Sequence, residues 1–368
     1  MQEMKEKDPD ALMQAGARLG LGDCPSRSAE VAGGWINRTW KVTYPRPNGR
    51  CETYILQRIN RNVFQNAPAV MENIEKVSAH IFSKRPDTVF PRFCHAPDGR
   101  NYFESPDGGF WRAYRYIDAE TFLSCHDLQV LFEAGGALGD FQAHLLDFDA
   151  SSLRETIPGF HDAARYLERL LEAKAADPLG RARAVQAEFA YLCSMRSAAV
   201  RLGDARAAGR LPLRVTHNDT KLSNVLFDRC THKRLTLVDL DTVMPGLAAY
   251  DFGDMVRSAA ATAPEDAANA SDMALDLAGF SQIAKGYLEA VGDVLTADER
   301  QSLASGALAA TLETAVRFLT DYIEGDRYFR IRYPEHNLVR ARSQIALARS
   351  MEAHFAQMQG IICALSGG

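Results

Sequence analysis

The hydrophobic pattern of the chain changes near residue 118, and this change restricts the folds that the chain can adopt. Before that point, alternating and β-branched residues predict short strands around one helix at 67–84. After it, apolar residues recur at helical spacing over long segments. The pattern predicts an α+β fold with a small β-rich lobe over residues 1–117 and a larger helical lobe over residues 118–368. The expected strands cover residues 40–44, 51–59, 88–94 and 110–117, and the expected long helices cover residues 127–148, 183–208, 271–291, 296–325 and 334–363.

The clearest local signal is a hairpin that joins the strands at 40–44 and 51–59. The residues between them include Asn48 and Gly49, a pair that readily adopts the positive φ angles of a tight turn. The two strands are therefore expected to pair in an antiparallel manner.

Composition and charge indicate an ordinary globular protein. Apolar residues make up 46% of the chain, charged residues make up 24%, and the formal net charge is −5. Like charges form no long runs, which argues against a nucleic-acid partner. The longest apolar-leaning stretch, at 303–312, is far shorter than the roughly 18 residues that span a bilayer, and the N-terminal residues lack the apolar core of a secretory signal. We expect a cytoplasmic protein with no membrane partner, and the sequence leaves its oligomeric state open.

The cysteines and histidines do not form a recognisable metal site. The chain has 7 cysteines and 9 histidines, with neither a Cys-x-x-Cys nor a His-Glu-x-x-His pattern. The cysteines are expected to be reduced thiols.

A polar motif lies among short β-branched runs between residues 211 and 241. It has the form His-x-Asp-x-x-x-x-Asn and consists of His217, Asp219 and Asn224. Further along the chain, Asp239 follows an apolar strand-like run. Such a motif arises by chance roughly 0.02 times in a chain of this length and composition, so it is a useful functional signal.

Phosphoryl transfer accounts for this order of residues. One carboxylate, Asp219, would face and deprotonate an acceptor hydroxyl, while Asn224 and Asp239 would hold Mg²⁺. Lys221 is placed to counter the charge of the transferring phosphoryl group. His217 is expected to brace the loop. Each residue taken alone is an ordinary turn residue, but the combination favours catalysis.

These residues resemble the aminoglycoside phosphotransferase and choline kinase group, two-lobed relatives of the protein kinases. The resemblance implies ATP as co-substrate and Mg²⁺ as cofactor. It also implies a short loop over the phosphates, which corresponds here to residues 32–37 and includes Gly33, Gly34 and Asn37.

The third strand departs from that group, in which it usually carries a lysine for the α- and β-phosphates. Gln57 aligns with the lysine position and Arg58 is next to it. Because side chains alternate along a strand, only one of the two can reach the nucleotide. We favour Gln57; Arg58 would take the role if the register slips. The partner on the following helix is Glu72 or Glu75.

The segment that joins the two lobes also matches the group. The resemblance implies that backbone groups of Arg115, Tyr116 and Ile117 bind the adenine edge, and that Asp251 supports the catalytic loop.

A closer resemblance is to bacterial N-acetylhexosamine 1-kinases. In those enzymes a late helical segment closes the sugar pocket, which by matching positions implicates Arg317 and Tyr328, together with Thr242 and the acceptor-facing Asp219. Without the family, Arg317 and Asp321 would be a surface ion pair at i and i+4, and Tyr328 would be a core residue. The segments that carry the resemblance are 239–246, 250–254, 317–329 and 334–338.

The resulting hypothesis is a kinase that transfers phosphate from ATP to the anomeric hydroxyl of N-acetylhexosamines, GlcNAc or GalNAc. One alternative is a kinase for another alcohol, such as an amino alcohol or an aminoglycoside, although Arg317 and Lys221 do not suit a cationic substrate. A second alternative is a nucleotide-binding pseudokinase, which the missing lysine of the third strand suggests.

Overall fold

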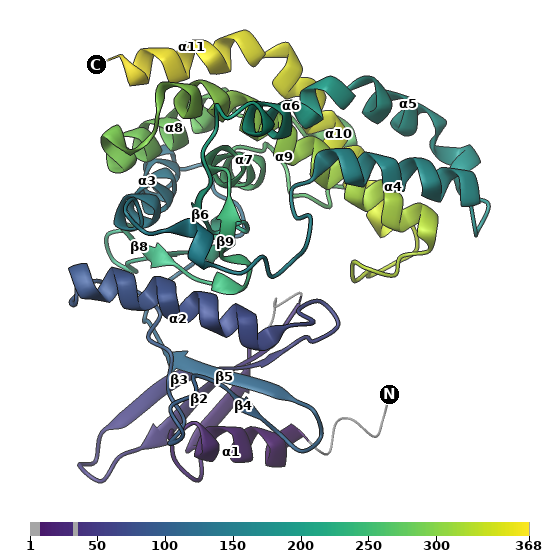
Figure 1. Ribbon diagram of the computed structural model, residues 1–368. Helices are drawn as coiled ribbons and strands as arrows, with labels where there is room; N and C mark the ends of the chain where they lie inside the picture. Colours follow the sequence, from purple (N-terminus) through teal and green to yellow (C-terminus); the bar gives the residue numbers. More distant parts are fainter. Residues whose placement is uncertain (1–7, 32–35, 368) are drawn as a thin grey trace. The chain divides into compact units, whose positions relative to one another are not determined.

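The computed structural model describes residues 8–31 and 36–367, which form two compact units (Figure 1). The first unit extends to Asp118 and includes the short segment Leu153–Thr156. The second unit consists of Ala119–Ser152 and of the chain from Ile157 onward. One unit is built on an antiparallel sheet and the other is mainly helical, so the α+β class predicted from the hydrophobic pattern is confirmed.

The first unit contains a five-stranded antiparallel sheet with the strand order β1-β2-β3-β5-β4. The helix α2 has the predicted bounds, and the Asn66 side chain caps its first turn by accepting a hydrogen bond from the backbone N–H of Ala69. The elements of this unit are α1 (Asp8–Arg18), β1 (Arg27–Glu30), β2 (Arg38–Pro45), β3 (Cys51–Ile59), α2 (Ala67–Lys84), β4 (Phe103–Glu104) and β5 (Phe110–Arg115).

The two faces of this sheet differ in chemistry because side chains alternate along each strand. One face packs against α1 and forms a hydrophobic core around Trp40, Leu56 and Trp111. The ring centroids of Trp40 and Trp111 are 5.4 Å apart. The opposite face carries polar side chains at its centre, which are described with the candidate site.

Two details of the first unit differ from the sequence-based expectation. The turn after β2 is a wider loop in which only Gly49 has a positive φ, of 74°. The strand expected at 88–94 is wrong: its only ladder contact is an isolated bridge between Phe93 and Tyr114. Pro91 explains the difference, because proline has no N–H to donate to a ladder.

Helices dominate the second unit (Figure 1). The closest helix pairs are α3 with α8, α7 with α9, and α9 with α10. Among the described residues, no helix is long and apolar enough to cross a membrane. The helices are α3 (Leu128–His144), α4 (Ala163–Ala176), α5 (Gln186–Ser194), α6 (Arg196–Ala207), α7 (Ala248–Ala259), α8 (Leu277–Val291), α9 (Ala297–Glu324), α10 (His336–Ala353) and α11 (Phe355–Ser366).

Two of the expected long helices are interrupted. The segment 183–208 breaks at Met195 into α5 and α6, and the segment 334–363 breaks at His354 into α10 and α11. A single non-helical residue redirects the chain while it hardly disturbs the apolar spacing on either side, so periodicity does not reveal such a break. The helices α1 and α4 were not predicted.

Two short antiparallel ladders lie within the helical unit and confirm the β-branched runs. In one ladder β6 (Arg214–Thr216) pairs with β9 (Met244–Gly246), and in the other β7 (Val225–Phe227) pairs with β8 (Arg234–Leu237). The turns at the ends of these strands carry the polar motif.

Close packing of α3 against α8 depends on glycine. A Cβ atom at Gly286 of α8 would collide with the carbonyl oxygen of Phe132 on α3. We expect Gly286→Ala to lower the free energy of unfolding by about 1–3 kcal/mol, since backbone has to move to make room. Urea unfolding followed by circular dichroism measures this loss.

Gly203 on the exposed side of α6 is the matched control, because a Cβ there meets nothing within 4 Å. Gly203→Ala should stabilise the protein slightly, as alanine is the better helix former. Equal effects of the two substitutions would contradict the packing argument.

Candidate active site

The turn between β6 and β7 carries the polar motif. Asn218 has a φ of 62°, in the left-handed region that asparagine tolerates better than most residues. The chain reverses there, and a short 3₁₀ turn, Leu222–Asn224, leads into β7. Asp239, at the end of β8, has a φ of 66° and likewise turns the chain sharply.

Asp251 in the first turn of α7 holds this loop in place. Its carboxylate accepts hydrogen bonds from the backbone N–H groups of His217 (2.8 Å) and Asn218 (2.7 Å). Its carbonyl oxygen accepts one from the Thr220 hydroxyl. Burial raises the pKa of Asp251, and the nearby imidazole and the two N–H donors act against this rise. The expected supporting role of Asp251 is confirmed.

The His217 ring braces the loop from inside. Its Nε2 lies 2.9 Å from the carbonyl oxygen of Val238, and its Nδ1 accepts a hydrogen bond from the backbone N–H of Asp219 at 3.3 Å. The ring of Phe141 packs edge-on against it. Since both ring nitrogens face backbone groups, His217 positions the loop, as expected.

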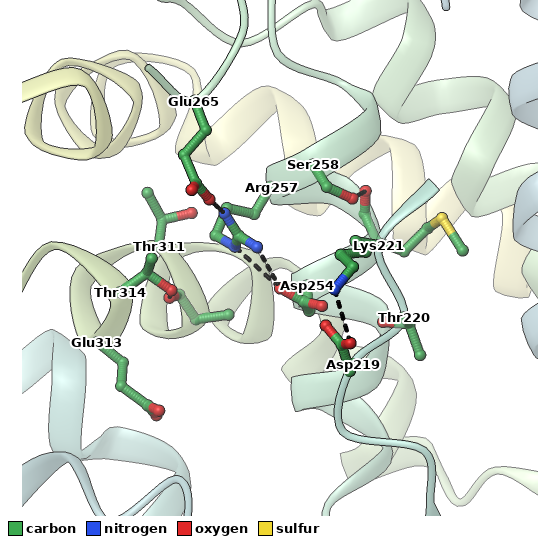
Figure 2. Close-up of polar contacts among 12 residues, drawn as sticks. Asp219, Thr220, Lys221, Asp254, Arg257, Ser258, Glu265, Thr311, Glu313 and Thr314 are labelled. Carbon is green, nitrogen blue, oxygen red and sulfur yellow. Dashed lines mark hydrogen bonds and ion pairs between the residues drawn. The ribbon is translucent and has the colours of Figure 1, made fainter. Parts of the chain in front are cut away.

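Asp219 has two side-chain partners on one oxygen. Its Oδ2 lies 2.8 Å from Lys221 Nζ (Figure 2). The same oxygen lies 2.9 Å from Asn224 Nδ2. The Asn224 amide also donates to the Asp219 carbonyl oxygen at 2.8 Å, which fixes its orientation. Because both bonds are made by Oδ2, the other carboxylate oxygen, Oδ1, remains for a ligand. The Asp219 side chain is 26% exposed.

The surrounding charges determine the ionisation of Asp219 and Lys221. Burial by itself raises the pKa of Asp219, but the Lys221 ammonium and the Asn224 amide outweigh burial and keep that pKa below its usual value. Burial lowers the pKa of Lys221, but the carboxylates of Asp219, Asp239 and Asp254 outweigh it and raise that pKa. Both groups are therefore charged at neutral pH.

Asp254 on α7 is a third acidic neighbour that the sequence analysis missed. The buried Arg257 guanidinium binds Asp254 Oδ1 through Nε (2.9 Å) and Nη2 (2.7 Å), and its Nη1 binds Glu265 at 2.7 Å (Figure 2). Arg257 thus fixes Asp254, whose charge acts on Lys221. The i, i+3 spacing of Asp254 and Arg257 on a helix was the available sequence signal.

Asn224 and Asp239 fit a hard divalent cation by their donor chemistry. The Val238 N–H donates to the Asn224 carbonyl oxygen at 2.9 Å, which brings the end of β8 beside Asn224. The Nδ2 bonds of Asn224 turn its Oδ1 away from Asp219, and carboxylate and amide oxygens are what Mg²⁺ prefers. Within the described part of the chain, no group of three or more His, Cys, Asp or Glu residues is arranged as a metal site, so phosphate oxygens and water would have to complete the coordination.

Thr242, expected to contact substrate, belongs to the internal scaffold of the loop. Its hydroxyl donates to the carbonyl oxygen of His217 at 2.6 Å, and its carbonyl oxygen accepts from Asn218 Nδ2 at 2.8 Å. The structure therefore gives Thr242 a bracing role, and its contact with substrate stays a prediction.

Arg317 on α9 lies in an aromatic cluster rather than on the surface. Its Cζ is 5.3–5.7 Å from the ring centroids of Phe160, Tyr166 and Tyr328, and of Phe329. Its side chain is 19% exposed and its Nη1 lies 3.8 Å from Glu313 Oε1. The alternative surface pair with Asp321 is wrong, because a different partner occupies each residue.

Asp321 instead organises the turn that carries Tyr328. Its carboxylate accepts hydrogen bonds from the backbone N–H groups of Arg327, Tyr328 and Phe329 at 2.8–2.9 Å, and from Asn337 Nδ2 at 2.9 Å. Tyr328 is 49% exposed and contacts the ring of Phe329 edge-on. Arg317 and Tyr328 therefore lie together, as the proposed sugar pocket requires, and Tyr328 is not a core residue.

Glu313 and His161 complete this cluster and were not predicted. Glu313 is almost fully buried, and its Oε2 lies 3.0 Å from His161 Nδ1. His161 stacks on the ring of Tyr250 at 4.3 Å. Burial raises the pKa of Tyr166, next to Arg317, to about 12, so its hydroxyl stays protonated.

In the first unit, Gln57 and Arg58 project from opposite faces of β3. Gln57 is buried and bonds to Thr39 Oγ1 (3.2 Å) and to Arg112 Nε (2.9 Å). Arg58 is on the α1 face, where it pairs with Asp107 at 3.0 Å. Gly33 and Gly34 lie outside the described residues, and Asn37 accepts a hydrogen bond from the N–H of Asn60 through its Oδ1.

Neither candidate helix partner bonds to Gln57 in the contacts described. Glu72 pairs with Lys76 (2.8 Å) and Arg154 (2.9 Å), and Glu75 binds His95 and Asn101. The α2 carboxylates thus serve other contacts within the first unit.

The segment expected to bind adenine has some of its backbone already paired. The N–H of Arg115 donates to the carbonyl oxygen of Arg92 at 3.1 Å, and the N–H of Tyr116 donates to that of Thr53 at 3.0 Å. The N–H groups of Arg115 and Tyr116 are therefore engaged within the unit, and the contact of this segment with the adenine edge stays a prediction.

Comparison with known proteins decides the family. The model of the phosphotransferase enzyme family matches residues 28–285. The chain belongs to this family. The matched range includes the motif around Asp219 of this phosphotransferase.

Solved structures share the fold of this phosphotransferase at low sequence identity. The microcompartment-associated aminopropanol kinase is 17% identical, with 95% of this chain and 98% of that chain covered and a TM-score of 0.64. A spectinomycin phosphotransferase in complex with ADP and spectinomycin is 11% identical, with 94% and 98% covered and a TM-score of 0.58. An amicoumacin kinase in complex with AMP-PNP, Ca²⁺ and Ami is 14% identical, with 92% and 88% covered and a TM-score of 0.54.

Loss of the Asp251 carboxylate should destabilise the phosphotransferase. Asp251→Ala would leave two buried N–H groups without an acceptor, at about 1–3 kcal/mol each. We expect the free energy of unfolding, measured by urea denaturation, to fall by roughly 2–4 kcal/mol.

Asp228→Ala is the control, because Asp228 also accepts two backbone N–H bonds, from Cys230 and Thr231, but in an exposed turn where water can replace it. Its effect should stay within about 1 kcal/mol. Similar losses in both variants would show that burial at Asp251 does not matter.

Proposed function

We propose that this phosphotransferase is an ATP- and Mg²⁺-dependent kinase that phosphorylates the anomeric hydroxyl of N-acetylhexosamines, GlcNAc or GalNAc, to give the 1-phosphate. The observation that carries the proposal is the Asp219 carboxylate, ionised and fixed through one oxygen by Lys221 and Asn224. The sugar acceptor is supported by the aromatic cluster around Arg317 and by the sequence resemblance.

Asp219 would act as general base. Its Oδ1 takes the proton of the acceptor hydroxyl while the hydroxyl oxygen forms a bond to the γ-phosphorus. The bond between that phosphorus and the bridging oxygen breaks, and ADP leaves. Lys221 keeps Asp219 ionised and places a positive charge beside the reacting groups.

Asn224 Oδ1 and the Asp239 carboxylate would hold the Mg²⁺ ion. The ion supplies positive charge that offsets the charge of the nucleotide phosphates. The Asn224 amide is oriented by its bond to the Asp219 carbonyl oxygen, and the N–H of Val238, the residue before Asp239, bonds to the Asn224 carbonyl oxygen.

Arg317 and Tyr328 would bind the sugar. A guanidinium surrounded by aromatic rings presents N–H donors to ring hydroxyls, and the half-exposed phenol of Tyr328 adds a ring face and a hydroxyl. Asp321 positions Tyr328 through the backbone of its turn.

The main alternative is a kinase for a cationic alcohol, as the aminopropanol kinase and the spectinomycin phosphotransferase of similar fold suggest. A partly buried arginine at the acceptor site, Arg317, would disfavour an ammonium group by like-charge repulsion. A pseudokinase is disfavoured because an acceptor-facing carboxylate serves no purpose in a protein that only binds nucleotide.

ADP release with Mg-ATP distinguishes these functions when it is measured against GlcNAc, GalNAc, choline and an aminoglycoside. Turnover of the acetamido sugars, with a 1-phosphate identified by ³¹P and anomeric proton NMR, would support the proposal. Turnover of choline or the aminoglycoside alone would overturn the sugar assignment, and thermal stabilisation by Mg-ATP without turnover of any acceptor would favour the pseudokinase.

Removing the base should slow the chemical step. Asp219→Asn keeps the hydrogen-bonding shape but cannot accept the proton, so we expect kcat to fall by about 10²-fold or more. A steady-state assay of ADP release measures this, with unchanged circular dichroism as the folding check. Near-normal turnover would disprove the role of Asp219, and the distant Asp228→Asn should leave kcat unchanged.

Arg317→Met should weaken acceptor binding. Loss of a charged donor to a sugar hydroxyl is expected to raise the KM for the acceptor by about tenfold or more while the KM for Mg-ATP stays constant. Arg342→Met, which removes an exposed pair with Glu188, should change neither constant. An unaltered acceptor KM in the Arg317 variant would exclude it from the sugar pocket.

A further inference from the structure

A polar row crosses the centre of the sheet in the first unit. Thr39 of β2 lies opposite Gln57 of β3, which lies opposite Arg112 of β5. The Arg112 Nε donates to Gln57 Oε1 at 2.9 Å, and Gln57 Nε2 donates to Thr39 Oγ1 at 3.2 Å. Directly opposite residues share a face, so the three side chains form one continuous row.

The Arg112 guanidinium is buried. The residue is 1% exposed, its Nη1 lies 3.8 Å from the sulfur of Met71, and its Cζ lies 5.4 Å from the ring centroid of Phe93. Water screens a buried charge poorly, so the positive charge of Arg112 acts strongly on an anion near this face of the sheet.

The same face leads to the segment expected to bind adenine. Arg112 of β5 is four residues before Tyr116 in the chain. Lys41 of β2 is exposed on this face and places its ammonium 3.6 Å from the ring centroid of Tyr116. The opposite face has its own cation, Arg58, but that residue pairs with Asp107.

We propose that Arg112 supplies, through Gln57, the positive charge for the nucleotide phosphates that β3 itself lacks. Gln57 makes the contact with phosphate, and Arg112 is the positioning residue behind it. The inference rests on the proposed use of ATP. It means that the positive charge expected from a lysine on β3 comes instead from the neighbouring strand β5.

The hydrogen-bond directions support this division of roles. Because Arg112 donates to Gln57 Oε1, the amide has to present its Nε2 hydrogens on the other side, which is the polarity that a phosphate oxygen needs. One of these hydrogens bonds to Thr39, and the second is available for phosphate. A charged donor on Oε1 also polarises the amide and strengthens its own donors.

A charge exchange across the two strands tests the inference. The Kd of Mg-ATP is measured by calorimetry on the full chain for Arg112→Gln, Arg112→Lys, Gln57→Lys and the double variant Gln57→Lys with Arg112→Gln, and kcat and the KM for ATP are measured beside it. Arg112→Gln should weaken Mg-ATP binding by at least about tenfold, and Arg112→Lys should retain much of the affinity because it keeps the charge.

If a single substitution disturbs folding, the double variant still tests whether Arg112 supplies the charge for Mg-ATP binding. Gln57→Lys alone sets an ammonium against the guanidinium and should bind poorly or unfold, whereas the double variant returns the cation to β3 with its amide partner on β5. It should be folded and should bind Mg-ATP within about threefold of the wild type. A folded double variant that binds no better than Arg112→Gln would overturn the inference.

Arg58→Gln is the matched control on the other face, and it should leave the Kd of Mg-ATP unchanged. Wild-type affinity in a folded Arg112→Gln protein would overturn the role of Arg112 while the proposed function stands. A wild-type protein that binds no Mg-ATP would overturn the proposed function and this inference with it.

Discussion

The buried carboxylate of Asp251 is the interaction on which the candidate site depends. It accepts hydrogen bonds from two successive N–H groups, those of His217 and Asn218, at the point where the chain reverses after β6. The position and direction of Asp219 follow from this anchoring, because Asp219 is the next residue. A loop held from a helix keeps the carboxylate of Asp219 in one geometry without help from a ligand, as its proposed catalytic role requires.

Charge balance is the second constraint. Three carboxylates, from Asp219, Asp239 and Asp254, act on one ammonium, that of Lys221. The excess negative charge makes the site suited to a divalent cation, while the arginine clamp on Asp254 keeps part of that charge compensated from behind. Lys221 therefore keeps Asp219 ionised and offsets part of the negative charge of the site.

Local sequence patterns predicted the elements that depend on neighbouring residues in the sequence. They did not predict contacts between residues that are far apart in the chain. The helix α2 and the hairpin of β2 and β3 follow from periodicity and turn chemistry, and the spacing from His217 to Asn224 predicted one compact loop. The pairing of Gln57 with Arg112 joins residues 55 positions apart, and no local pattern reveals which strand lies next to β3. The same reason explains why the aromatic cluster around Arg317 was not predicted, since its rings come from two distant segments, around residues 160–166 and at Tyr328.

The setting of Arg317 bears on the kind of acceptor. Glu313 is almost fully buried and shared between His161 and Arg317, but its distance to the guanidinium, 3.8 Å, is too long for a strong hydrogen bond. The aromatic rings around the guanidinium attract it through their faces. In the proposed sugar pocket, its N–H groups would donate to ligand oxygens, which suits a neutral polyhydroxy ring. If the acceptor binds beside Arg317, as proposed, an ammonium-bearing acceptor would meet a fixed positive charge there, since an arginine cannot lose its proton to accommodate it.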